Sequence, residues 1–179
     1  MRARQSLRAF TLVEILVVLV IIGIAAAVVV PQIGTQSDLR AAAAARLIMA
    51  DLIYAQNRAI ATQTKHYVSF DTTAGNQSYR IMMGAGLADI PQPITKETYY
   101  QVRLGQKGTP LSDISLGTVS IETFKTIGFD ELGVPYFYDP AGPTTTALSV
   151  SGGSTIQIKC GQFTLTVSVE PFTGEIKVN

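Results

Sequence analysis

The hydrophobic residues of this chain are concentrated near its N-terminus, in one nearly uninterrupted apolar segment. Between residues 10 and 33, about 19 of the 24 residues are apolar, and Glu14 is the only charged residue. An apolar run of about 20 residues is typical of a helix that crosses a bilayer, because the hydrocarbon core is roughly 30 Å thick. The segment 10–33 is therefore predicted to be a transmembrane helix.

A helical period continues over residues 34–65. Ile48, Leu52 and Ala55 follow one another at spacings of four and three residues, which predicts an amphipathic helix with one buried face. The charged residues of this stretch, Asp51 among them, lie mostly off that face. This second segment is predicted to form a spine that leads into the rest of the chain.

Pro31 lies between the two helical segments. A proline inside a helix removes one backbone hydrogen bond and clashes with the carbonyl four residues earlier, here that of Ala27. One long helix bent at Pro31 is the preferred prediction. The alternative is a second helix that starts anew with Thr35 or Ser37 as its cap.

From His66 onward the hydrophobic period changes to two, which predicts strands. The strand-like runs cover residues 66–71, 78–83, 98–104, 118–124, 154–160, 162–169 and 175–178. Turn signals rich in Gly, Asn and Pro separate them, and the last two runs predict a terminal hairpin. The fold is therefore predicted to be α+β, with a long N-terminal helix packed on an antiparallel sheet of about seven strands in a head domain, residues 66–179.

The composition agrees with a membrane segment attached to a globular head. Hydrophobic residues make up 47% of the chain and charged residues only 15%, against a usual charged share of about 25%. This balance excludes a disordered chain. Because the excess of apolar residues lies in the segment 10–33, the remainder has an ordinary composition.

The candidate reactive residues form no catalytic constellation, so no enzymatic activity and no cofactor are expected. Cys160 is the only cysteine, which excludes an intrachain disulfide, and it is predicted to be a small buried hydrophobe. His66 is the only histidine, and it is predicted at the surface or at a sheet edge. Asp130 and Glu131 are adjacent, but no calcium-loop pattern surrounds them. A metal site is therefore not predicted.

The first nine residues carry three arginines and no acid, which predicts that the N-terminus stays cytoplasmic. A cleaved signal peptide with its cutting site near residues 25–27 is one interpretation. A retained helix is the favoured one, because Glu14 interrupts the start of the apolar run and Pro31 is followed by a further helical pattern. Glu14 is conspicuous, since a carboxylate at lipid depth costs about 2.5 kcal/mol or more.

The run Ala9-Phe10-Thr11-Leu12-Val13-Glu14, followed by a continuous apolar helix, resembles the N-terminus of type IV pilins and of the pseudopilins of type II secretion. The resemblance implies a prepilin leader, residues 1–9, which a membrane prepilin peptidase cuts between Ala9 and Phe10. It also implies N-methylation of Phe10 and an assembly role for Glu14 and Pro31. The chain departs from the family in one respect, because the residue before the cut is usually Gly.

The head is similar to that of the GspH/FimT-like minor pseudopilins. The similarity lies in the segment with Phe129, Gly133 and Pro135, and in the final hairpin with Gly174. From the residues alone, the segment 127–135 is predicted to be a turn between strands, with Gly133 at a positive φ and Pro135 ending it.

The resemblance implies a structural subunit, a minor pseudopilin of a type II secretion pseudopilus that supports protein export. It would cross the inner membrane once, with a cytoplasmic N-terminus and a periplasmic head, and then enter a periplasmic or surface filament. The implied partners are other pseudopilins or pilins, prepilin peptidase, the inner-membrane assembly platform and membrane lipid.

Two other functions stay open. One is a type IV pilus subunit, major or minor, including a FimT-like DNA-uptake pilin; the other is a membrane-anchored periplasmic enzyme. Nucleic-acid binding is not expected, because the chain without its leader has 11 basic and 13 acidic residues. The single cysteine argues against a major pilin of the common sort, which has a C-terminal disulfide loop.

Overall fold

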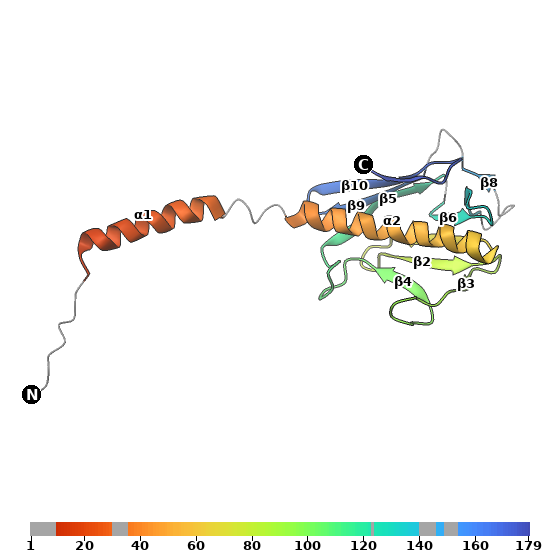
Figure 1. Cartoon of the computed structure of the whole chain (residues 1–179), viewed down its shortest axis with the longest axis horizontal. Helices are drawn as coiled ribbons and strands as arrows, with labels where there is room; N and C mark the ends of the chain where they lie inside the picture. Colours follow the sequence, from red (N-terminus) through yellow and green to blue (C-terminus); the bar gives the residue numbers. More distant parts are fainter. Residues whose placement is uncertain (1–9, 30–35, 123, 140–145, 149–153) are drawn as a thin grey trace, which may run out of the picture. The chain divides into compact units, whose positions relative to one another are not determined.

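The structure is a computed structural model of the whole chain (Figure 1). It describes residues 10–29, 36–122, 124–139, 146–148 and 154–179. The chain divides into two compact units, one ending at Gln36 and the other running from Ser37 to Asn179. The predicted leader and Pro31 lie outside the described residues, so the predicted bend at Pro31 stays a prediction.

The first unit contains one described helix, α1, Leu12–Val29, of 18 residues. At 1.5 Å per residue this helix is about 27 Å long. Across the described parts of the chain, no helix combines the length and the apolar character needed to span a membrane. The transmembrane helix predicted over residues 10–33 is thus described only as α1, and its insertion into a membrane stays a prediction.

All but the first residue of the 27-residue helix α2, Gln36–Thr62, belongs to the second unit. Its alanine-rich sequence favours a helix, because alanine has the highest helix propensity. The predicted buried face is confirmed: Ile48, Leu52 and Ala55 are all at most 1% exposed. The helix stops before Gln63, whose φ of 49° is left-handed, and the Gln63 side-chain amide donates to the Ile60 carbonyl at 2.8 Å.

The strands of the head form two antiparallel sheets in the described residues. Their bounds are β1 His66–Asp71, β2 Ser78–Met83, β3 Ala88–Asp89, β4 Tyr100–Arg103, β5 Ile114–Ile121, β6 Thr126–Phe129, β7 Pro135–Phe137, β8 Thr146–Ala147, β9 Ser154–Cys160, β10 Phe163–Val169 and β11 Ile176–Val178. The larger sheet has the order β3-β2-β1-β6-β7-β8, with β4 also paired to β2, and the smaller sheet has the order β11-β10-β9-β5.

The prediction of one sheet with about seven strands is therefore wrong, because the described head has eleven strands in two sheets. Strands β3 and β8 have two residues each, which is too short for an alternating pattern to be visible. The segment 127–135, predicted to be a turn between strands, is the β6–β7 hairpin, and the two strands take up both ends of that segment. Pro135 does not end that turn; it begins β7, opposite Phe129.

One hydrophobic core joins the helix to both sheets. It contains Ile48 and Leu52 of α2, Ile81 and Ile127 of the larger sheet, and Ile156 of the smaller sheet. All five are at most 1% exposed. Figure 1 shows α2 lying along both sheets, with β9 and β10 on one side of it and β2 and β4 on the other. The helix is therefore the element that both sheets share.

The prediction that His66 lies at the surface is wrong, because its side chain is fully buried. His66 stands at the start of β1, a central strand, and pairs with Met83 on β2 and Phe129 on β6. Its Nδ1 donates to the Thr64 carbonyl oxygen at 2.8 Å. Burial lowers the pKa of His66, which favours the neutral ring.

Asp51 also differs from its prediction, because it is buried on the face of α2 that packs against the larger sheet. Its carboxylate accepts hydrogen bonds from the hydroxyl groups of Tyr79 at 2.5 Å and Tyr100 at 2.7 Å. Tyr79 belongs to β2 and Tyr100 to β4. Burial raises the pKa of Asp51, and the two hydroxyl hydrogen bonds act in the opposite direction. One carboxylate thus connects α2 to two neighbouring strands.

The burial of Asp51 predicts a pH-dependent component of stability. The folded-state pKa lies above the ordinary value of 3.8, so the folded state retains a proton that the unfolded state has lost. The contribution of Asp51 to the unfolding free energy of the parent chain should therefore fall as the pH rises above about 4. Asp51→Asn removes this component, so the unfolding free energy of the variant relative to that of the parent should increase as the pH rises above about 4.

Urea denaturation of the full chain in mild detergent, followed by circular dichroism at several pH values, measures this difference. Asp89→Asn is the matched control for loss of a charge, because Asp89 is an exposed aspartate paired with Arg80. A difference between Asp51→Asn and the parent that does not change with pH would contradict the prediction.

Candidate functional site

The first candidate site is the start of α1, where Phe10 and Glu14 flank the beginning of the helix. The Thr11 hydroxyl oxygen accepts a hydrogen bond from the Glu14 backbone N–H at 3.2 Å. The Thr11 carbonyl oxygen accepts the first helical hydrogen bond, from the N–H of Ile15 at 3.2 Å. Thr11 is therefore the N-cap, and Thr11-Leu-Val-Glu14 has the sequence of a capping box.

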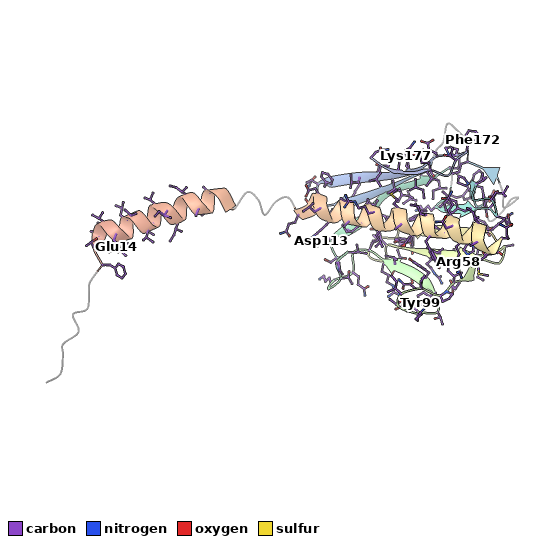
Figure 2. All side chains as sticks on the ribbon, in the orientation of Figure 1. Glu14, Arg58, Tyr99, Asp113, Phe172 and Lys177 are labelled. Atoms are coloured by element: carbon purple, nitrogen blue, oxygen red, sulfur yellow. The ribbon has the colours of Figure 1, made fainter. Side chains whose placement is uncertain are left out.

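Glu14 occupies the third position of α1, in its first turn, where the helix dipole favours a negative charge. It is the only charged residue of α1, and Figure 2 shows its side chain at the start of that helix. The large apolar side chains of α1 are exposed on every side, from 81% at Leu12 down to 46% at Val18. A helix that is apolar all round is stable when a membrane or other helices cover it. The geometry thus fits helix association next to a single carboxylate.

Comparison with known protein families identifies this same region. The family described as "Prokaryotic N-terminal methylation motif" matches residues 4–30. The comparisons with curated proteins and with solved structures return no match. The chain therefore carries a type IV prepilin-like N-terminus, the kind that prepilin peptidase processes and that assembles with other pilins. Ala9, at the expected cut, lies outside the described residues.

The second candidate site is in the head, where the structure brings the predicted motif residues together. Phe129 and Pro135 pair across the β6–β7 hairpin, and Gly133 lies in its turn with a φ of 83°. The prediction of a positive φ at Gly133 is confirmed. Gly174 lies in the turn between β10 and β11. A Cβ atom at Gly174 would be 3.1 Å from the Gly133 carbonyl oxygen and 3.4 Å from Cδ of Pro135.

Gln56 of α2 connects these two turns, and the sequence did not single it out. Its side-chain amide donates to the Gly133 carbonyl oxygen at 2.9 Å. The same amide nitrogen lies against Gly174, where any Cβ atom would overlap it. Gln56 thus holds the second half of α2 against one turn of each sheet, the turn at Gly133 and the turn at Gly174. This is a contact that holds the helix in place, with no reacting group in it.

Among the remaining candidate residues, His66 is the cross-strand neighbour of Phe129, and Asp130 and Glu131 lie in the turn that follows Phe129. Cys160 is a free, buried cysteine, as predicted. The Nε2 atom of His66 is buried without a hydrogen-bond partner among the described residues. No group of three or more His, Cys, Asp or Glu residues in the described parts of the chain could hold a metal ion.

The close approach at Gly174 predicts a cost for any side chain there. Gly174 and Gly161 both lie in hairpin turns of the smaller sheet, with φ values of 66° and 59°. An alanine at either position costs about 1–2 kcal/mol for its left-handed backbone. Only Gly174→Ala must also displace Gln56, because no atom lies within 4 Å of the Cβ position at Gly161. Overpacking adds about 1–3 kcal/mol.

Gly174→Ala should therefore lower the unfolding free energy by more than Gly161→Ala does, as measured by urea denaturation of the two full-length variants. Equal losses would show that Gln56 and the Gly133 turn move aside without cost.

Proposed function

We propose that the chain is a minor pseudopilin of the GspH/FimT kind, a structural subunit of a type II secretion pseudopilus. The observation that carries this proposal is the methylation motif over residues 4–30, which continues into a capped apolar helix with Glu14 as its only charge. In this function the chain is a subunit that assembles with other subunits and supports protein export, and it catalyses no reaction.

The apolar segment 10–33 anchors the subunit in the inner membrane before assembly. The three arginines of the leader stay on the cytoplasmic side. The head then lies in the periplasm, and the assembly platform moves the subunit from the membrane into a periplasmic or surface filament. Because α1 exposes apolar side chains on every face, it is stable in lipid and equally in a bundle of similar helices.

The charge of Glu14 gives the assembly a fixed register. Cleavage before Phe10 creates a new amine, which remains a cation whether it carries no methyl group or one. Glu14 lies four residues further on, about one helical turn away. In a bundle, Glu14 of one subunit meets the amine of a neighbour, and two groups that are each costly in lipid neutralise one another.

The head residues support the GspH/FimT kind within this group. Gly133, Pro135 and Gly174 were singled out by their similarity to that family, and in the structure they meet around Gln56. Such a contact holds the strands of the head against α2. A structural subunit needs this, because its head must move together with its helix during assembly.

A type IV pilus subunit is the second candidate function, because the same N-terminal motif serves pilins and pseudopilins alike. Copurification of the assembly partners from membranes distinguishes the two machines. A DNA-uptake role is less well supported, since the chain without its leader has more acids than bases. Salt-sensitive DNA binding by the processed chain would favour that role.

The proposal predicts cleavage between Ala9 and Phe10. Coexpression with a prepilin peptidase should yield a membrane protein that begins with a methylated Phe10, as read by mass spectrometry. Ala9→Gly, which restores the usual family residue, should speed the cleavage. Ala9→Leu should block it, because a bulky side chain replaces a small one. An extracted protein that begins at Met1, or one that is cut after Ala27 as a signal peptide would be, would contradict the proposal.

The proposal also predicts that Glu14 is needed for assembly and not for membrane insertion. Glu14→Val leaves the neighbour's amine unpaired, at a cost of about 2.5 kcal/mol or more. Incorporation into sheared filaments should fall more than about tenfold, while the amount in the membrane stays unchanged. Glu14→Gln removes only the charge and should fall similarly, whereas Val13→Ala is the neighbouring control. Full incorporation of Glu14→Gln would rule out the charge pairing.

A further inference from the structure

The start of α1 lies close to the bond that is cut in the proposed function. Phe10 and Thr11 are both outside the helix, which begins at Leu12. The Phe10 side chain is 75% exposed. Two non-helical residues therefore separate the Ala9–Phe10 peptide bond from the first residue of α1.

The residues that fix the start of α1 all lie on the C-terminal side of this bond. Thr11 is the N-cap, because its hydroxyl oxygen accepts the Glu14 N–H and its carbonyl oxygen accepts the Ile15 N–H, each at 3.2 Å. Phe10 and Ile15 occupy the two positions of a hydrophobic staple, one before the cap and one in the fourth position of the helix. The signal that starts α1 is therefore complete without the leader.

The leader contains one residue that competes for the start of the helix. Ser6 is the only Ser, Thr, Asp or Asn among residues 1–9, and these residue types are the preferred helix caps. The three residues that follow Ser6 are Leu, Arg and Ala, which all have high helix propensity. A helix that began after Ser6 would contain the Ala9–Phe10 bond in its first turn.

A helix that contained this bond would protect it from hydrolysis. The Ala9 carbonyl oxygen would accept the Val13 N–H, and the Phe10 N–H would donate to the Ser6 carbonyl oxygen. In the hydrolysis, the hydroxyl group of a water bonds to the Ala9 carbonyl carbon, the C–N bond breaks, and the remaining proton goes to the Phe10 nitrogen. Proteases cut exposed irregular segments in preference to helices, because the backbone is accessible there.

We propose that Thr11 is a positioning residue for leader cleavage. Its cap starts the helix at Leu12, which leaves the Ala9–Phe10 bond outside the helix and accessible to prepilin peptidase. Thr11 acts through the conformation of the backbone before it and takes no part in the reaction itself. This inference rests on the proposed function in that the leader is cut at this bond. It adds a physical reason why the helix start and the cut lie side by side in the sequence.

Cleavage kinetics of the full chain in mild detergent test this role. Each variant is incubated with prepilin peptidase, and mass spectrometry follows the fraction that begins at Phe10. Thr11→Val keeps the size and branching of the side chain and removes the capping oxygen, so cleavage should slow by about fivefold. Thr11→Ser and Thr11→Asn retain a capping oxygen and should be cut at close to the parent rate.

The same series separates capping from recognition of the side chain by the peptidase. A peptidase that recognised the shape of Thr11 would cut Thr11→Val at the parent rate and Thr11→Asn slowly, and this result would overturn the proposal. Leu12→Ala is the matched control, because it changes a side chain of the first turn and no capping group. It should be cut at the parent rate, and a loss equal to that of Thr11→Val would also overturn the proposal.

A second substitution in the leader tests the competing helix. Leu7→Gly disfavours a helix that starts after Ser6. It should restore most of the cleavage rate when it is combined with Thr11→Val, and it should leave the rate of the parent chain unchanged. A double variant that is cut as slowly as Thr11→Val alone would overturn the proposal.

The parent chain distinguishes the two possible failures. A parent chain that stays uncut would overturn the proposed function, and this inference with it. A parent chain that is cut at the same rate as Thr11→Val would overturn only the positioning role of Thr11.

Discussion

The packing of α2 against two sheets at once is the interaction on which the head depends. The buried face of this helix is made largely of alanine in its first half, with Ala41, Ala44 and Ala45 at most 1% exposed. Small side chains let strands approach the helix axis closely, and the larger Ile48 and Leu52 then fill the space between the sheets. Both sheets therefore bury apolar side chains in one core that they share with the helix.

Polar contacts determine where along the sheets this helix lies. Apolar packing alone tolerates small shifts, whereas hydrogen bonds in a buried environment depend closely on position. The Asp51 carboxylate accepts hydrogen bonds from the hydroxyl groups of Tyr79 and Tyr100, which belong to the larger sheet. Gln56, little more than one turn further on, reaches the turn at Gly133 and touches the turn of the smaller sheet. Asp51 and Gln56 together fix the position of α2 relative to the larger sheet and relative to the smaller sheet.

The sequence predicted the elements whose patterns are long and regular, and it failed where the tertiary structure overrides local pattern. The buried face of α2 and the terminal hairpin follow from periodicity. Strands of two residues are too short to show an alternating hydrophobic pattern. Pro135 is typical of a turn, although in the structure it begins β7, the strand next to the edge strand β8. His66 and Asp51 are buried because of the strands that flank them, and single-residue exposure preferences cannot show that. In the site, Glu14 was conspicuous from composition, whereas Gln56 is an ordinary polar residue until the two turns come together.

The positions of Asp51 and Gln56 have a mechanical consequence. In the proposed function, a subunit moved by its N-terminal segment would experience a pull along α2, and the contacts between α2 and the sheets would pass that pull to the head. Hydrogen bonds that cross from the helix to β2, β4 and the Gly133 turn carry such a load in shear, and several bonds share it at once. The hydrogen bonds in the middle of α2 thus resist separation of the helix from the sheets. The apolar core around them prevents water from replacing those bonds.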